Sequence, residues 1–205
     1  MKIHTVVVGE FQVNCYVAAD DAGRAIVIDP GADADKVAAL IRRQALRVAA
    51  YLCTHGHIDH VSGLAELHRL FPAPIGMHPR DAKWAFTQAN QMLPFYPAPD
   101  RPPAIARSLA DGQCWQDGDL NYQVLETPGH SPGGVCLYFP AEGLVFTGDT
   151  LFAGSVGRTD LPGGNERLLG ESLAKLTALP EATRVCAGHG PETTIGQEKA
   201  ANPFL

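Results

Sequence analysis

Features that would place this chain in a membrane, on nucleic acid or in a disulfide framework are missing from its sequence. No apolar run approaches the length needed to span a bilayer. The N-terminus turns polar by Glu10 and lacks the layout of a signal peptide. No cluster of lysine and arginine marks a phosphate-binding surface, and the net charge is −6. We therefore expect a cytoplasmic protein that binds neither membranes nor nucleic acid.

Cysteine is sparse, and its spacing excludes the usual paired motifs. The five cysteines are odd in number, far apart and never in a Cys-x-x-Cys pair: Cys15, Cys53, Cys114, Cys136 and Cys186. This distribution predicts reduced thiols and no disulfide frame. Cys53, Cys136 and Cys186 lie in short apolar runs, where we expect them to be small buried hydrophobic residues.

The pattern of apolar residues predicts an α/β protein. The 205 residues are 45% hydrophobic and suit one domain with a sizeable core. Short apolar runs bounded by turn residues predict strands at 1–8, 14–19, 25–28, 48–53, 74–77, 113–117, 120–126, 134–139, 144–147 and 183–186. Amphipathic periodicity predicts helices at 33–47, 62–71, 81–92, 165–179 and 195–201. We expect a single domain over residues 1–205, built from two strand-rich halves that are flanked by helices.

Residues 93–103 interrupt this alternation. They contain five prolines and therefore cannot form a helix. We expect a surface loop that flanks the functional site, with a linker as the alternative. Phe95 and Tyr96 in this segment either line a pocket or pack the loop against the body of the protein.

Residues 54–60 are the most informative stretch. They read Thr-His-Gly-His-Ile-Asp-His and carry His55, His57, Asp59 and His60. Imidazole and carboxylate groups at this density are ligands that suit zinc, iron or manganese. A core without metal would have to give each of these polar groups a partner, and a plain surface would not fix their alternation. The stretch therefore predicts a metal site on a loop between a strand and a helix.

Three later residues are candidates to complete that site. His130, Asp149 and His189 each follow a glycine at or shortly after the end of a predicted strand. Glycine beside a ligand allows the backbone to approach a crowded ion closely. Seven such groups suit two ions that share a bridging carboxylate. The remaining histidines, His4, His68 and His78, lack this context, and we expect ordinary side chains there.

In type, spacing and order these motifs resemble those of the metallo-β-lactamase-fold superfamily. Residues 54–60 are similar to its His-x-His-x-Asp-His signature. The resemblance implies a four-layer αββα sandwich with the site at the edge between its two sheets. It also implies one metal position made by His55, His57 and His130, a second made by Asp59, His60 and His189, and a bridge from Asp149.

Within the superfamily, the chain is most similar to the short bacterial hydroxyacylglutathione hydrolases, which are glyoxalase II-like. Residues 151–164 and 188–205 carry this similarity. Class B β-lactamases commonly have cysteine where this chain has Asp149, and flavo-diiron proteins have glutamate where it has His57. Both branches are therefore disfavoured. We expect no separate C-terminal helical domain for binding glutathione.

This resemblance implies a metallohydrolase that cleaves a small thioester such as S-lactoylglutathione by means of a metal-bridging hydroxide. Two divalent ions are implied, zinc in the first place and iron or manganese as alternatives. Asp59 is expected to bind metal and to orient the hydroxide, and Asp29 to support the ligands. Arg158 is expected either to contact a substrate carboxylate or to form a salt bridge with Asp160 that shapes its loop.

Other functions stay open at this point. Persulfide dioxygenases share the ligand cluster and a segment similar to residues 157–160, and they use a single iron. A lactonase-like hydrolase is a further alternative, as is a metal-binding module without turnover. The sequence leaves the oligomeric state undetermined.

Overall fold

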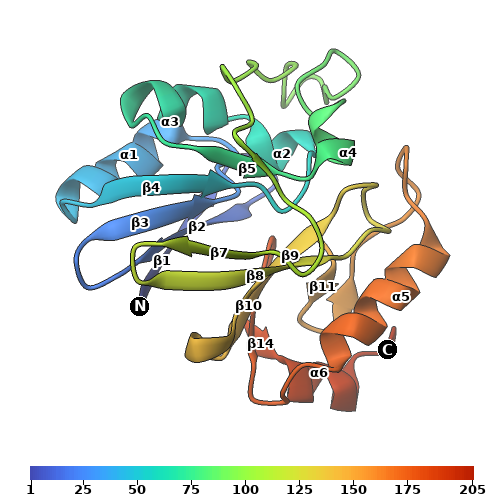
Figure 1. The fold of residues 1–205 in the computed structure, drawn as a ribbon. Coiled ribbons are helices and arrows are strands. Elements are labelled where there is room, and N and C mark those ends of the chain that lie inside the picture. The colour runs from blue at the N-terminus through green and yellow to red at the C-terminus, as the bar shows by residue number, and fades with distance from the viewer.

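The computed structural model describes all 205 residues, whose strands form two six-stranded sheets and one small hairpin (Figure 1). The first sheet contains, in order, β1 (Lys2–Val8), β2 (Val13–Ala19), β3 (Arg24–Ile28), β4 (Arg47–Leu52), β5 (Ile75–Met77) and β6 (Arg107–Ser108). Its first three strands pair antiparallel, and β3 to β6 pair parallel. Parallel neighbours need crossover connections, and the connections that follow β3 and β4 contain helices.

The second sheet has the order β14-β13-β10-β9-β8-β7. Its strands are β7 (Cys114–Asp117), β8 (Leu120–Glu126), β9 (Val135–Phe139), β10 (Leu144–Gly148), β13 (Arg184–Ala187) and β14 (Thr193–Thr194). Only β10 and β13 pair parallel, and the chain between them forms the hairpin of β11 (Leu151–Phe152) and β12 (Ser155–Val156) and then a long helix. The two sheets are thus successive halves of the chain.

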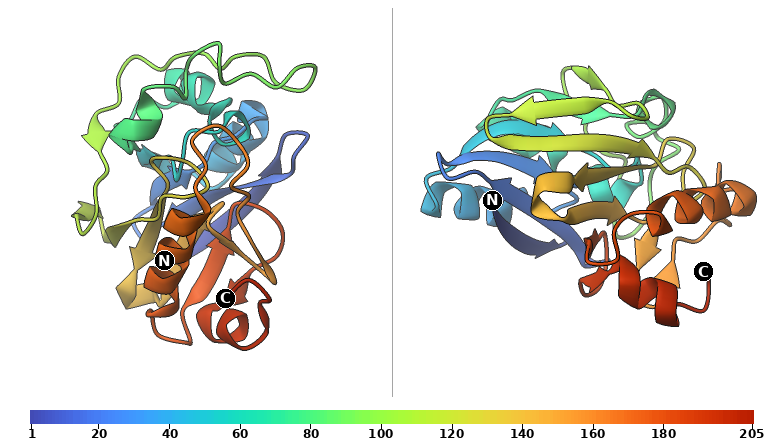
Figure 2. Two further views of the ribbon diagram at one scale, coloured as in Figure 1. Left: turned by 90° about the vertical axis from the view of Figure 1, so that its right-hand side faces the viewer. Right: turned by 60° about the horizontal axis from the view of Figure 1, so that its bottom comes forward.

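Helices cover the outer face of each sheet. The first half contributes α1 (Ala34–Arg43), α2 (Ile58–Val61), α3 (Leu64–Leu70) and α4 (Pro79–Ala82), and the second contributes α5 (Glu166–Thr177) and α6 (Ile195–Ala201). A short 3₁₀ helix, η1 (Pro140–Glu142), joins β9 to β10 and has no buried residue. Figure 2 shows these two groups of helices on opposite sides of the paired sheets. The result is the expected α/β fold, a four-layer αββα sandwich in one domain. None of its helices has the length and apolar character required to cross a membrane.

Three apolar clusters fill the spaces between the four layers. The central cluster joins the sheets and includes Ile28 and Leu52 from the first and Phe139 and Phe146 from the second. Two outer clusters join each sheet to its helices. Strands such as β2 are buried along their whole length because both of their faces are covered. All five cysteines are free, and Cys53, Cys136 and Cys186 are buried as predicted.

Two predicted helices are wrong in extent. The helix expected at 62–71 begins earlier and is interrupted at Gly63, whose N–H bonds to the carbonyls of Pro30 and Gly31. The helix expected at 81–92 is reduced to α4 and a series of turns. In those turns the side chains of Thr87 and Asn90 bond to backbone carbonyls, which competes with helix formation.

Candidate metal centre

The ends of four strands bring all seven predicted metal-binding residues to one edge of the sandwich. His55 and His57 follow β4 of the first sheet, and Asp59 and His60 lie in α2 directly after them. The second sheet supplies the other three residues, which follow β8, β10 and β13: His130, Asp149 and His189. The centre is therefore shared between the two halves of the chain.

Three groups of three side chains have the spacing of metal ligands, and one of them, Asp29 with His55 and His60, overlaps the other two. One potential ligand atom from each of His55, His57 and His130 lies within 4.8 Å of the others, and the same holds for Asp59, His60 and His189. In the first group, His57 Nδ1 is 2.8 Å from His130 Nε2. In the second group, His60 Nε2 is 3.3 Å from His189 Nε2. These clusters are suitable for a dinuclear metal site.

Asp149 lies between the two groups. Its Oδ1 is 3.3 Å from His60 Nε2, and its Oδ2 is 3.6 Å from His130 Nε2 and 3.5 Å from His189 Nε2. One carboxylate therefore faces nitrogen atoms of both groups. This is the position that a bridging ligand requires.

Hydrogen bonds on the far side of four imidazole rings fix which nitrogen faces the centre. The Nδ1–H groups of His130 and His189 donate to the carbonyl oxygens of Arg158 and Phe11, at 2.8 and 2.9 Å. His60 Nδ1–H donates to Asp29, and His55 Nδ1–H donates to Thr54 Oγ1. Each of these rings thus has its Nδ1 engaged on the far side and its Nε2 directed inward, the orientation that metal-binding histidines require.

Asp29 lies behind this arrangement. Its carboxylate accepts hydrogen bonds from the N–H of Thr54 at 2.7 Å, from Thr54 Oγ1 at 2.6 Å and from His60 Nδ1 at 3.1 Å. Both of its oxygens are occupied in this way. Asp29 therefore orients His60 and the start of the ligand loop, and the carboxylates that remain for an ion are Asp59 and Asp149.

The pKa values of these groups are shifted by burial and by the charges of neighbouring imidazoles and carboxylates. Burial, together with the neighbouring imidazoles, holds the pKa of His55 well below its usual range and lowers the pKa of His57 to about 4. For His189, burial acts in the opposite direction to Asp149 and Asp59, which prevail and raise its pKa to about 9. Burial also opposes ionisation of Asp149, but His60 and His189 hold its pKa well below the usual range. The carboxylates thus require positive charge beside them, which either protons or metal ions can supply.

Two buried polar atoms support the presence of metal. His55 Nε2 and Asp149 Oδ1 are buried and have no hydrogen-bond partner. Such atoms are costly to bury without a partner. Both face the centre, where a divalent ion would satisfy them. The donor set of imidazole and carboxylate fits zinc, iron or manganese.

A cavity of about 730 Å³ opens beside the centre. Its floor includes His57, Asp59, His130, Asp149 and His189, and Phe11 lies in its wall. The remaining wall comes from Ile58, Pro132 and the segments 84–92 and 158–163, and it is mostly apolar. The size suits a small organic molecule held against the metal-binding groups.

Arg158 lines this cavity, and it also makes the predicted salt bridge. Its Nε and Nη2 donate to the two oxygens of Asp160, both at 2.7 Å. Both side chains are largely exposed, at 62% and 67%. The pair occupies two of the five guanidinium N–H donors. The two roles expected of Arg158 are therefore compatible.

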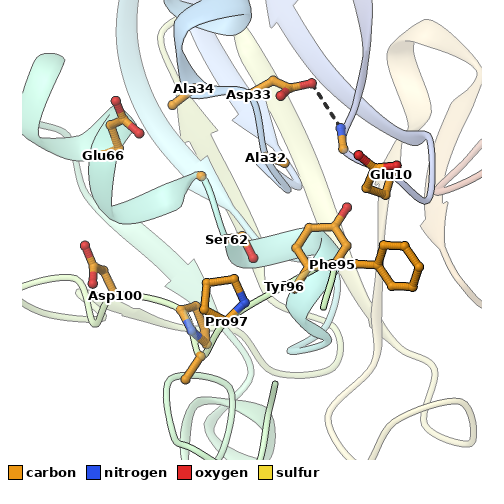
Figure 3. A pocket seen from close by; sticks show the side chains of 14 residues that line it. Glu10, Ala32, Asp33, Ala34, Ser62, Glu66, Phe95, Tyr96, Pro97 and Asp100 are labelled. Atoms are coloured by element: carbon orange, nitrogen blue, oxygen red, sulfur yellow. Dashed lines mark hydrogen bonds between the residues drawn. The ribbon is translucent and has the colours of Figure 1, made fainter. Parts of the chain in front are cut away.

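Phe95 and Tyr96 line a different cavity. This second cavity, of about 430 Å³, lies between the proline-rich loop and the starts of α1 and α3. Figure 3 shows Tyr96 and Pro97 below Asp33 and Ala34, with Glu66 on the left and Phe95 and Glu10 on the right. The two aromatic rings also pack on Phe11, with ring centroids 5.7 and 5.3 Å apart. The loop at 93–103 is thus a surface loop that contacts the metal cavity through Phe11.

Two buried residues at the centre had no signal in the sequence. Asp81 and Asn90 come from the segment predicted as a helix, and both bond to the backbone of Gly56 between His55 and His57. Asp81 also bonds to the loop that carries His130. An isolated aspartate and asparagine between turns carry no pattern that would have identified them.

Comparison with known proteins gives consistent matches. The family model described as the metallo-beta-lactamase superfamily matches residues 8–189. An uncharacterized protein from Aquifex aeolicus is 43% identical, with 100% of this chain and 97% of that protein covered. The probable metallo-hydrolase YqgX of Bacillus subtilis is 38% identical, and the hydroxyacylglutathione hydrolase GloC of Haemophilus influenzae is 37% identical. For each of these two, the match covers 100% of this chain and 98% of the relative.

Solved structures of proteins in the same superfamily also resemble this chain. The B3 metallo-beta-lactamase BLEG-1 has a TM-score of 0.94 at 38% identity, covering 100% of this chain and 99% of its own. A di-iron-bound form of TTHA1623 has a TM-score of 0.87 at 41% identity, covering 98% and 100%. ETHE1 from Myxococcus xanthus has a TM-score of 0.81 at 27% identity, covering 99% and 84%. With a family model matched over most of its length, this chain belongs to the metallo-β-lactamase superfamily.

Proposed function

We propose that this protein is a metal-dependent hydrolase of small thioesters, of the hydroxyacylglutathione hydrolase type. His55, His57 and His130 would hold one divalent ion, and Asp59, His60 and His189 a second, with Asp149 between them. Two ions held in this way would lower the pKa of a water molecule and polarise a carbonyl oxygen. Asp59 would bind metal and orient the attacking hydroxide.

The observation that carries the choice of a thioester is the composition of the cavity wall. Apart from the proposed ligands, the wall consists of Phe11, Ile58, Trp84, Ala89, Asn90, Gln91, Met92, Pro132, Arg158, Leu161, Pro162 and Gly163. None of these side chains is a general acid that works near neutral pH. This cavity would therefore be a poor catalyst for a reaction whose leaving group must be protonated. A thiolate leaves near neutral pH without a strong general acid, so a thioester suits this wall.

Arg158 is the one charged side chain of that wall outside the ligand set. A guanidinium binds carboxylate well, through paired hydrogen bonds. Its place at the cavity supports a substrate that carries a carboxylate away from the reacting carbonyl. Glutathione thioesters have this character, and the name of the GloC relative supports the same class.

Two other reactions are favoured by particular relatives and serve as rivals in the test. BLEG-1 is described as a B3 metallo-beta-lactamase, so β-lactam hydrolysis is a second candidate. The similarity to ETHE1 and to a di-iron protein keeps iron-dependent persulfide oxidation as a third. The three reactions differ in product and in co-substrate, and one set of assays separates them.

The test is to count metal ions per purified chain and to compare three activities. Thiol release from S-lactoylglutathione is measured beside oxygen uptake with glutathione persulfide and ring opening of a chromogenic β-lactam. We expect two ions per chain and thiol release that exceeds the other two activities. One iron per chain with oxygen uptake would refute the proposal, and so would efficient β-lactam cleavage without thiol release.

The substrate role of Arg158 has a separate test. Arg158→Ala should raise KM for the thioester about 10-fold, the usual worth of a charge-assisted hydrogen bond, and should leave kcat nearly unchanged. Arg167 is a matched control because it also pairs with an acidic neighbour, Glu171, at an exposed position. Arg167→Ala should not change KM. Equal kinetics for both variants would remove Arg158 from the substrate site.

A further inference from the structure

Asp81 is a fully buried carboxylate whose oxygens join two separate loops. Its residue exposure is 0%, and it lies in α4. Oδ2 accepts a hydrogen bond from the N–H of Gly56 at 2.9 Å and another from Ser131 Oγ at 2.7 Å. Oδ1 accepts from the N–H of Gly133 at 2.6 Å. The donors lie 25, 50 and 52 residues away in sequence, so these contacts are long-range connections within the fold.

On one side, the contact fixes the peptide between two proposed ligands. Gly56 separates His55 from His57, and its carbonyl accepts a hydrogen bond from Asn90 Nδ2 at 2.8 Å. Asp81 and Asn90 thus hold both polar groups of this residue. A Cβ on Gly56 would lie only 3.1 to 3.2 Å from atoms of Trp84, Ala85 and Asp81, so the segment around Asp81 packs directly on the turn.

On the other side, the contacts fix the loop of His130. Ser131 is the next residue, and Gly133 lies two positions beyond it. A Cβ on Gly133 would lie 2.8 Å from Asp81 Oδ1 and 2.7 Å from His78 Nδ1, so only glycine allows this approach. His78 itself accepts a hydrogen bond from the N–H of Arg80 at the start of α4 and contacts Glu126. The helix that presents Asp81 is therefore anchored independently.

The three residues reached through these contacts form one metal position. His55, His57 and His130 come from opposite sheets, and Asp81 is the side chain that hydrogen-bonds to both of their loops. Asp29, by contrast, bonds directly to His60 of the other position and reaches His55 only through Thr54. Asp81 is thus the buried carboxylate that connects the two loops of the first position directly.

We propose that Asp81 is the positioning residue of the metal position formed by His55, His57 and His130, and that it sets this position's affinity independently of the other. Asp81 acts through Gly56 and through Ser131 and Gly133, and it touches neither ion nor substrate. The proposal rests on the metal centre of the proposed function and not on its substrate. A wild-type protein that binds zinc but cleaves no thioester would refute the substrate and leave this role of Asp81 standing.

The test compares zinc binding at the two positions in Asp81→Asn and wild type. The two carboxylate oxygens of Asp81 accept three hydrogen bonds, but asparagine has only one side-chain oxygen. In one orientation of the amide, its NH₂ group faces the N–H of Gly56, and in the other it faces the N–H of Gly133. Ring ¹⁵N shifts of His55, His57 and His130 report the first position, and those of His60 and His189 report the second. We expect zinc affinity at the first position to fall about 10- to 100-fold, the usual effect of removing a group that orients ligands. Affinity at the second position should change by less than about threefold.

Asp20→Asn is the matched control. Asp20 is also a buried carboxylate with three hydrogen bonds, and one of them comes from the backbone of Asp119 in the second sheet. Its replacement should leave both zinc affinities unchanged. Equal loss at both positions in Asp81→Asn, or no loss at either, would overturn the proposal. Absence of zinc binding in the wild type would overturn it together with the metal centre.

A milder variant keeps the test decisive if Asp81→Asn does not fold. Ser131→Ala removes one of the three donors to Asp81 and keeps the carboxylate. Ser172→Ala removes another buried serine, whose hydroxyl donates to Pro128 O in the same loop at 2.7 Å without involving Asp81. Ser131→Ala should weaken zinc at the first position several-fold more than Ser172→Ala. Equal effects would show that general loosening of the loop explains the loss, and would refute the role of Asp81.

Discussion

Buried aspartates occur at both ends of the strands, but they are neutralised in different ways. At the end opposite the metal centre, Asp20 pairs with Arg24 at 2.7 Å, and Asp117 pairs with Arg107 at 2.6 Å. At the metal end no lysine or arginine lies within salt-bridge distance of the four aspartates there: Asp29, Asp59, Asp81 and Asp149. Their partners are imidazoles, hydroxyls and backbone N–H groups.

This difference separates a structural end from a functional one. At the structural end, the chain supplies the positive charge itself, through Arg24 and Arg107. At the metal end, the four aspartates have no lysine or arginine as an ion-pair partner, and the buried atoms His55 Nε2 and Asp149 Oδ1 have no hydrogen-bond partner. Buried carboxylates require compensation. Metal ions would provide it, and stability at this end should therefore depend on them, whereas stability at the other end should not.

Removing the metal should have the largest effect. A ligand present at about 1,000 times its Kd stabilises the folded state by about 4 kcal/mol, so chelation should lower Tm by roughly 10 °C and abolish thiol release. Hydrogen exchange, compared with and without chelator, should accelerate in residues 54–61 and 127–134. The turns at 20–24 and 117–120 should be unaffected below the unfolding temperature. Uniform acceleration at both ends would contradict the division between them.

Sequence and structure agree where the signal is local and differ where it is not. The strands were predictable because strands covered on both faces are continuous apolar runs, as in β2 and β3. Four of the seven proposed ligands were identifiable because imidazole and carboxylate rarely occur together so densely, and the other three because each follows a glycine near the end of a strand. Asp81 was missed because its partners are distant in sequence. The same long-range bonds also explain the wrong helix at 81–92, since Asn90 bonds to Gly56 as well as to Ala85.

A substitution at the opposite end should cost stability without loss of metal. Arg107→Met would leave Asp117 buried without its cation, since the Arg107 and Asp117 side chains are only 14% and 6% exposed. Breaking a buried pair in this way costs about 3 kcal/mol, which is measurable by urea unfolding. The zinc content and zinc affinity should stay at wild-type values. The double variant Arg107→Met with Asp117→Asn should recover much of the loss, and failure to do so would show that the charge is not its cause.

The smallest expected effect is the loss, at acidic pH, of the stability that the ionised Asp20 side chain contributes. Burial opposes its ionisation, but hydrogen bonds from Arg24 and Asp119 prevail and lower its pKa to about 2. A carboxyl group whose pKa is lower in the folded state stabilises the protein above its unfolded pKa of about 4, and this contribution is lost as pH falls towards 2. In chelator, wild type should therefore be more stable than Asp20→Asn at pH 5, and the gap should narrow as pH is lowered from 4 to 2. If the stability difference between wild type and Asp20→Asn stayed constant over this range, the charge of Asp20 would not be what stabilises the protein. The role assigned to the Asp20–Arg24 ion pair would then be wrong.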